Sequence, residues 1–276
     1  KVIEKRKRDK KIKDINNYRD TAIKMMIDNF NKFHELSNKT DLTHKEKLLL
    51  ESRKKIQISL AITYSCNLRC SYCFQQKYDG LARKPITLDE LEETLDKITV
   101  LIKENPDLEV SLGLFGGEPL LPKNEPIIDR IFQYCVDQKL KVDITTNGIF
   151  LPYFAKKLII YRSIISVIAI TVNTLPETYK EIVKITKVAN NTEKLLAITD
   201  FLLDYGIVMD VGTNFDKTNL YELVPIYSYF KEKGYFSREN FYWNIGRVDD
   251  RLFDTGYDDY IVSETDILLE LMKMKM

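Results

Sequence analysis

Residues 108–148 have the sequence LEVSLGLFGGEPLLPKNEPIIDRIFQYCVDQKLKVDITTNG, which contains one complete strand–helix–strand unit. The apolar run Leu108–Phe115 predicts a strand, and the three-to-four spacing of apolar residues in Glu125–Gln138 predicts a helix. Lys141–Thr145 predicts the next strand. Two strands joined through a helix favour a parallel pair with a right-handed crossover.

The same alternation continues from Ile56 to the end of the chain. The predicted strands are Gln57–Thr63, Leu108–Phe115, Lys141–Thr145, Ser166–Val172, Ile207–Gly212 and Phe241–Ile245. The predicted helices are Thr87–Lys103, Glu125–Gln138, Leu151–Tyr161, Thr192–Tyr205, Asn219–Lys233 and Glu264–Lys275. Six strands, each followed by a helix, predict a six-unit α/β barrel or an open doubly wound parallel sheet.

Residues 1–55 differ in composition and form a separate predicted region. The first eleven residues hold seven basic and two acidic side chains, which indicates a solvated arm. Helical spacing follows in Ile12–Leu36 and in Thr43–Lys55. We therefore expect a basic arm and helical extension over 1–55 and an α/β domain over 56–276.

The charge balance excludes a general attraction to polyanions. The chain has 42 Lys and Arg against 41 Asp and Glu, a net charge of +1, so no global field draws it to nucleic acid or to an anionic membrane. The longest apolar stretch, Leu158–Val172, is interrupted by Arg162 and is shorter than a membrane helix requires. With no secretory signal pattern either, we expect a cytoplasmic protein.

Glycine is scarce, with 10 residues in 276, so each one is expected where the backbone needs it. Six lie near the C-terminal ends of predicted strands: Gly113, Gly116, Gly117, Gly148, Gly212 and Gly246. Parallel α/β proteins build their binding sites at this end of the sheet.

Three of the four cysteines lie in one loop after the first predicted strand. Cys66, Cys70 and Cys73 have the spacing C-x3-C-x2-C, which lets one loop place thiolates at three corners of a cuboidal iron–sulfur cluster. Structural zinc is the alternative, but it usually takes four Cys or His ligands. Cys135 falls on the apolar face of a predicted helix and is expected to be a small buried hydrophobe.

The loop Cys66–Phe74 resembles the signature of the radical S-adenosylmethionine (SAM) superfamily. Gly116-Gly117-Glu118-Pro119 after the second strand and Thr145-Thr146-Asn147-Gly148 after the third resemble two further motifs of that family. The resemblance covers about residues 56–276. It implies a partial (β/α)6 TIM-type barrel.

The resemblance also implies cofactors and their ligands. Cys66, Cys70 and Cys73 would bind three irons of a [4Fe–4S] cluster, and SAM would chelate the fourth iron. An external one-electron donor would start the cleavage of SAM to a 5′-deoxyadenosyl radical, which suits an anaerobic cytoplasm. No general acid or base is assigned. The implied SAM contacts are Phe74 at the adenine, Gly116, Gly117 and Glu118 at the methionyl amine, and Thr145, Asn147, Thr171 and Asn173 at the ribose or carboxylate.

The form of the motifs is most similar to the branch that modifies peptides and proteins, such as anaerobic sulfatase-maturating enzymes and ribosomal-peptide maturases. The first hypothesis is therefore a peptide or protein substrate. That branch commonly adds a cysteine-rich C-terminal domain, whereas this sequence has no cysteine after Cys135. We expect that auxiliary domain to be absent from this chain.

Two features leave other functions open. After the fourth strand, many relatives have Ser-Leu-Asp-Gly where this chain has Thr171-Val172-Asn173-Thr174. Relatives often contact the SAM carboxylate with an Arg from the fifth strand, whereas the candidate here is Arg247, after the sixth. The second hypothesis keeps the radical chemistry on a small molecule or nucleotide in cofactor biosynthesis. The third is a non-catalytic iron–sulfur or zinc module.

Overall fold

The computed structural model describes residues 43, 54–70, 72–73, 75, 85–173, 175, 183–185, 192–248 and 261–274. Packing divides the chain into two compact units. One comprises Lys1–Ile56 with Asp107–Glu109, and the other comprises Gln57–Pro106 with Val110–Met276. The helical extension predicted for 1–55 lies almost entirely outside the described residues, and the domain boundary at 55/56 stays a prediction.

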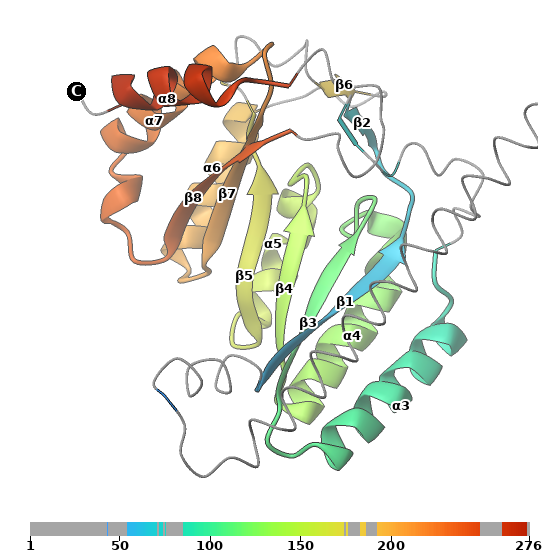
Figure 1. Cartoon of the computed structure of the whole chain (residues 1–276). Coiled ribbons are helices and arrows are strands. Elements are labelled where there is room, and N and C mark those ends of the chain that lie inside the picture. Colours follow the sequence, from blue (N-terminus) through green and yellow to red (C-terminus); the bar gives the residue numbers. More distant parts are fainter. Residues whose placement is uncertain are drawn as a thin grey trace, which may run out of the picture. The chain divides into compact units, whose positions relative to one another are not determined.

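A six-stranded parallel sheet forms the centre of the larger unit (Figure 1). Its order is β1-β3-β4-β5-β7-β8, so strands that follow one another through a helix are neighbours in the sheet. This confirms the α/β fold and is the arrangement of a partial TIM-type barrel in which β1 and β8 are the two edges. The strands are β1 Lys55–Thr63, β3 Glu109–Gly116, β4 Lys141–Thr146, β5 Ile165–Thr171, β7 Met209–Phe215 and β8 Phe241–Arg247.

The helices bury one apolar face each. On α4 the side chains of Ile128, Ile131 and Phe132 have no exposed surface, and Cys135 beside them is fully buried, as the sequence predicts. Helices α4, α5 and α6 lie on one face of the sheet, behind it in Figure 1. The α-helices are α3 Leu88–Glu104, α4 Glu125–Gln138, α5 Leu151–Ile160, α6 Thr192–Asp204, α7 Leu223–Glu232 and α8 Glu264–Lys273; the 3-10 helices are η2 Pro122–Asn124, η3 Leu220–Glu222 and η4 Tyr235–Ser237.

The ends of several helices follow from their sequence. Thr87 and Glu90 form a capping box at the start of α3, because each side chain bonds the other residue's backbone N–H. Gly206 and Gly234 adopt positive φ at 79° and 72° just after α6 and α7. The helix predicted over Asn219–Lys233 instead begins as the 3-10 turn η3 and continues as α7.

A second sheet of two short strands was not predicted. β2, Leu68–Cys70, pairs antiparallel with β6, Val183–Ile185, through three residue pairs. In the sequence, Leu68–Cys70 falls within the predicted cysteine loop. The pairing therefore gives this loop regular backbone hydrogen bonds to a distant segment.

None of the helices described in the structure is long and apolar enough to cross a membrane.

Candidate functional site

The three cysteines of the loop lie close together in a partly buried position after β1. Burial raises the pKa of the Cys66 thiol, and it raises that of Cys70 to about 12, with the neighbouring loop thiols adding to both shifts by like-charge repulsion. The backbone N–H of Leu68 opposes the shift at Cys66, since it donates to that sulfur at 3.3 Å. Because their pKa values are raised, Cys66 and Cys70 need a positively charged partner to be stable as thiolates.

Two glycines let this loop start close to the end of β3. A Cβ atom at Gly116 would lie 2.1 Å from the carbonyl oxygen of Thr63, and one at Gly117 would lie 2.3 Å from that of Ser65. The backbone N–H groups of Gly117 and Glu118 donate to these same two oxygens at 2.7 and 2.9 Å. The Gly-Gly pair therefore joins the ends of β1 and β3 next to Cys66.

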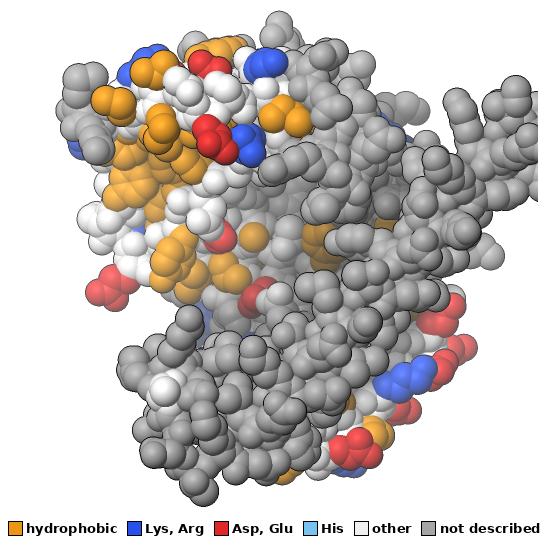
Figure 2. All heavy atoms as spheres, viewed as in Figure 1, with side chains coloured by type: hydrophobic (Ala, Val, Ile, Leu, Met, Phe, Trp, Pro, Cys, Tyr) orange, Lys and Arg blue, Asp and Glu red, His pale blue; other side chains and the backbone are white. Residues whose placement is uncertain are grey.

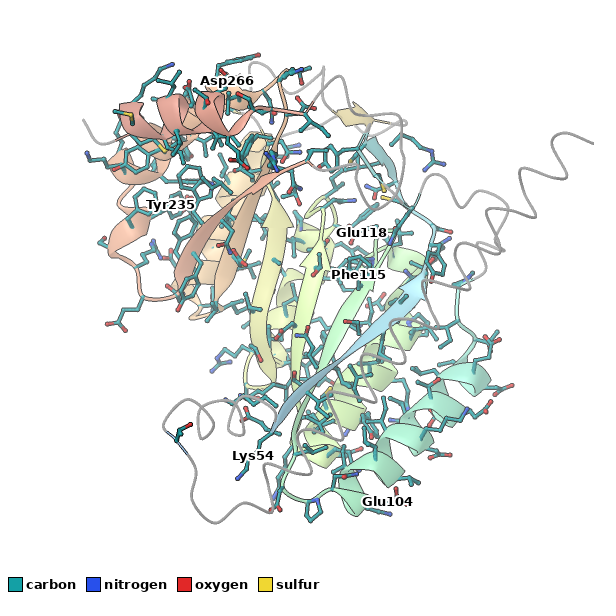
Figure 3. All side chains as sticks on the ribbon, in the orientation of Figure 1. Lys54, Glu104, Phe115, Glu118, Tyr235 and Asp266 are labelled. Atoms are coloured by element: carbon teal, nitrogen blue, oxygen red, sulfur yellow. The ribbon has the colours of Figure 1, made fainter. Side chains whose placement is uncertain are left out.

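Glu118 follows the glycine pair and has no exposed surface. Figure 3 shows it beside Phe115 at the C-terminal end of β3. Its Oε1 accepts from the N–H of Leu120 at 2.8 Å and the hydroxyl of Thr146 at 2.6 Å, and its Oε2 accepts from the N–H of Asn147 at 2.7 Å. Burial raises the pKa of the carboxyl to about 7, and these bonds partly oppose the rise.

A hydrogen-bond network fixes the other end of the cysteine loop. The side chain of Asn173 donates to the Tyr72 hydroxyl at 2.8 Å and accepts from the backbone N–H of Asn214 at 2.9 Å. Asn219 in turn donates to the carbonyl oxygens of Asn173 and Asn214 at 3.1 and 3.0 Å. Burial raises the pKa of Tyr72, and the nearby Cys70 adds to the rise. Tyr72 thus links the loop to the ends of β5 and β7.

A cavity of about 260 Å³ opens between the cysteine loop and the strand ends. It brings together all three loop cysteines and six of the eight predicted SAM contacts. Its lining residues are Cys66, Leu68, Cys70, Tyr72, Cys73, Gln75, Phe115, Gly116, Gly117, Thr145, Thr146, Asn147, Thr171, Asn173 and Asn214.

The other two predicted contacts are Phe74 and Glu118. Phe74 lies outside the described residues, and Glu118 directs its carboxylate to the β3 and β4 ends instead of the cavity. Arg247, the candidate for a carboxylate contact, donates to the carbonyl oxygen of Val262 at 3.4 Å and is also absent from the lining. Glu118 therefore has protein partners where the sequence predicted a ligand ammonium.

Six lining residues were not predicted as contacts, and two of them, Tyr72 and Asn214, also belong to the Asn173 network. Tyr72 stands between two of the motif cysteines, and Asn214 stands two residues after Gly212 at the end of β7. Only their places in the sequence, within the cysteine loop and at a strand end, could have indicated a role in the site. Their role depends on Asn173, which joins them through space.

The part of the chain that the structure describes contains no group of three or more His, Cys, Asp or Glu converging on one metal ion. An iron–sulfur cluster does not need such convergence, because each thiolate binds a different iron. The cysteine loop is therefore compatible with the cluster predicted from its spacing.

Curated proteins similar to this chain include two GTP 3′,8-cyclases. That of Staphylococcus haemolyticus is 26% identical over 217 residues, which cover 76% of this chain and 59% of that protein. That of Aquifex aeolicus is 29% identical over 231 residues, which cover 80% of this chain and 65% of that protein. This chain thus spans less than two thirds of either relative.

Solved structures share the fold at low sequence identity. The protein anSMEcpe with bound AdoMet and Kp18Cys peptide has a TM-score of 0.63 at 18% identity, covering 80% of this chain and 59% of that chain. The FeFe-hydrogenase maturase HydG from Carboxydothermus hydrogenoformans has a TM-score of 0.56 at 16% identity, covering 87% and 58%. At these identities the likeness concerns the fold alone.

The model of one protein family matches residues 60–228, more than half of the chain. That family carries a [4Fe–4S] cluster and SAM, and the matched span contains the cysteine loop and the ends of β3, β4, β5 and β7. The chain belongs to the radical SAM superfamily.

Proposed function

We propose that this chain holds a [4Fe–4S] cluster on Cys66, Cys70 and Cys73, binds SAM in the strand-end cavity, and modifies a small molecule or nucleotide in cofactor biosynthesis. One observation carries the site: the three thiols and the ends of β3, β4, β5 and β7 line the same cavity. The substrate class is supported by the similarity to GTP 3′,8-cyclases over three quarters or more of this chain. This substrate class replaces the peptide as our first choice.

The described residues fit the two cofactors. Thiolates are the protein ligands of iron–sulfur clusters, and bound iron offsets the cost of burying their charge. Gly116 and Gly117 leave the backbone of the cavity wall uncovered by side chains, so a ligand can approach it closely. Thr145 and Thr171 add hydroxyls from two neighbouring strands.

When bound and reduced by an external one-electron donor, the cluster and SAM would supply a 5′-deoxyadenosyl radical able to remove a hydrogen atom from the substrate. The chain's own residues hold and orient the reactants and keep water away from them. The short β2–β6 sheet and the Tyr72–Asn173 bond fix the cysteine loop over the strand ends. A fixed loop keeps the radical source at one place above the sheet.

A peptide substrate is the second candidate, and the charge of the cavity favours it. The lining that the structure describes contains no Lys or Arg. A nucleotide would need its phosphates held by residues elsewhere, whereas a peptide side chain enters an uncharged cavity without that requirement.

The proposal is tested by anaerobic reconstitution with iron and sulfide, followed by measurement of 5′-deoxyadenosine release. We expect about four irons per chain and faster release with GTP, or with another nucleoside triphosphate of a panel, than with SAM and reductant alone. Replacing Cys66, Cys70 and Cys73 together by Ala removes the cluster and the release. Cys135→Ala is the matched control and retains both, because Cys135 is buried on α4.

Two outcomes contradict different parts of the proposal. Stoichiometric zinc in anaerobically purified protein, or full iron content in the triple variant, overturns the cluster. Release of 5′-deoxyadenosine that no nucleotide changes overturns the nucleotide substrate and leaves another small molecule or a peptide.

A further inference from the structure

Asn147 follows the last residue of β4 and has protein partners at both ends of its side-chain amide. Its Oδ1 accepts from the backbone N–H of Ile149 at 3.1 Å. Because a backbone N–H can only donate, this contact identifies which end of the amide is the oxygen. The NH₂ group therefore faces the cysteine loop.

That NH₂ group has two hydrogens and two acceptors. Its Nδ2 lies 2.8 Å from Oδ1 of Asn67 and 3.8 Å from Sγ of Cys66. The second distance is within the range of hydrogen bonds to sulfur. One side chain thus contacts both the first cysteine of the loop and the residue after it.

The backbone of Asn147 is itself anchored. Its N–H donates to the buried carboxyl of Glu118 at 2.7 Å, and Glu118 is fixed by Leu120 and Thr146. The donor to the Cys66 sulfur therefore extends from a set of buried hydrogen bonds at the ends of β3 and β4. Such support is what holds a ligand residue in one orientation.

We propose that Asn147 is a positioning residue of the cluster, which fixes Cys66 over the end of β4 and raises the reduction potential through its hydrogen bond to the Cys66 sulfur. This inference rests on the cluster in the proposed function. Reduction adds negative charge to the cluster and its thiolates, and a hydrogen-bond donor at a sulfur stabilises the reduced form. Leu68 N–H is a second donor to the same sulfur.

This role differs from the SAM contact that the sequence implied for Asn147. Oδ1 is used by Ile149 and both hydrogens of Nδ2 are directed at the loop. Although Asn147 lines the cavity, its polar atoms act on the protein. Its effect on the chemistry passes through Cys66.

The test measures the midpoint potential of the reconstituted cluster without SAM, by a redox titration followed by electron paramagnetic resonance. Asn147→Leu removes the NH₂ group, with both of its donor hydrogens, at a similar side-chain size. Asn147→Asp keeps an oxygen acceptor for Ile149 but loses the NH₂ group. We expect both variants to have a more negative potential than the native chain. A changed signal shape and faster loss of iron to a chelator are expected as well.

Asn240→Leu is the matched control. The Asn240 side chain donates to the carbonyl oxygens of Leu203 and Ile207 at 2.9 and 3.0 Å and contacts neither the cysteine loop nor the cavity. This variant is expected to lower the melting temperature while keeping the native potential. It separates a general loss of stability from an effect on the cluster.

Native iron content with an unchanged potential in both Asn147 variants overturns the inference and leaves the proposed function intact. Folded Asn147 variants that bind no iron, while Asn240→Leu binds it normally, support the positioning role. Failure of the native chain to bind iron overturns the proposed function itself, and the inference with it.

Discussion

Glu118 is a carboxyl group with no exposed surface and three hydrogen-bond donors around it. Its pKa in the folded chain is raised from 4.5 to about 7, because burial disfavours the charge more than the donors favour it. Between pH 4.5 and about 7 the folded state therefore binds more protons than the unfolded state. Its contribution to stability is largest below pH 4.5 and is lost as the pH rises to about 7.

Glu118→Gln changes the hydrogen bonding at one oxygen. A Gln carbonyl can accept from Leu120 and Thr146, but its NH₂ group would face the N–H of Asn147, which then loses its acceptor. At pH 5.5 we expect the variant to be less stable than the native chain by about 1–3 kcal/mol. The difference should shrink towards pH 8, because only the native carboxyl becomes charged. Urea denaturation at both values measures it.

Glu93→Gln is the control for this measurement. Glu93 is exposed on α3 and pairs with Lys97, so its replacement should change the free energy of unfolding by less than about 0.5 kcal/mol at either pH. A difference between native and Glu118→Gln that grows with pH would mean that the folded-state pKa is lowered, contrary to the structure.

The individual site residues were predictable to different degrees. The three cysteines and the Gly116-Gly117 pair stand out by spacing and by the scarcity of glycine. The burial of Glu118 and the contacts of Asn173 with Tyr72 and Asn214 had no such signal. They arise because separate strands end side by side, which a local pattern does not contain.

At the scale of elements, hydrophobic patterning predicted six strand–helix units, and the six-stranded sheet has them in that order. The β2–β6 pair could not be found in this way. Each of its strands has three residues, too few to show a period, and the paired residues Leu68 and Ile185 are far apart in the sequence. Its pairing depends on where β1 and β5 place the two loops.

The junction of β1 and β3 gives a test at this scale. In Gly117→Ala the new methyl group would lie 2.3 Å from the carbonyl oxygen of Ser65, next to Cys66. Because a backbone oxygen cannot move away by side-chain rotation, the strand ends must separate, at a cost of roughly 1–3 kcal/mol. We expect lower stability in urea and lower iron incorporation than in the native chain.

Gly212→Ala on β7 is the comparison. Its Cβ would lie 3.6 Å from the carbonyl oxygen of Ile170, an ordinary contact, and Gly212 does not line the cavity. We expect a change in stability of less than about 1 kcal/mol there. Equal effects of the two substitutions would show that the close approach at Gly117 does not hold β1 against β3.

At the scale of the larger unit, hydrophobic side chains gather on the surface over α7 and α8 (Figure 2). Ile267 on α8 packs against the cluster of Phe215, Leu223 and Val262. Three other apolar side chains of this helix are exposed: Leu268, Leu269 and Met272. Since these three remain in water, the stability of α8 comes mainly from its Ile267 side.

The last prediction concerns the division of the chain. Of the six-stranded sheet, the larger unit contains β4, β5, β7 and β8 wholly, β3 from Val110 onward and β1 from Gln57 onward. It also contains every described residue that lines the cavity. The smaller unit retains Lys54, whose carbonyl oxygen accepts from the N–H of Glu109 at 2.6 Å at the start of β1 and β3. A chain starting at residue 54 keeps both features, so we expect it to fold.

Far-ultraviolet circular dichroism and the iron content after reconstitution check this expectation against the full chain. Native-like values in both would mean that residues 1–53 are not needed for the cluster, and would make them available for recognising the substrate. Loss of the cluster with a folded shortened chain would assign part of the site to the smaller unit. Loss of the fold would mean that the boundary predicted at 55/56 does not separate two domains, because a self-sufficient core must bury its apolar faces without the removed residues.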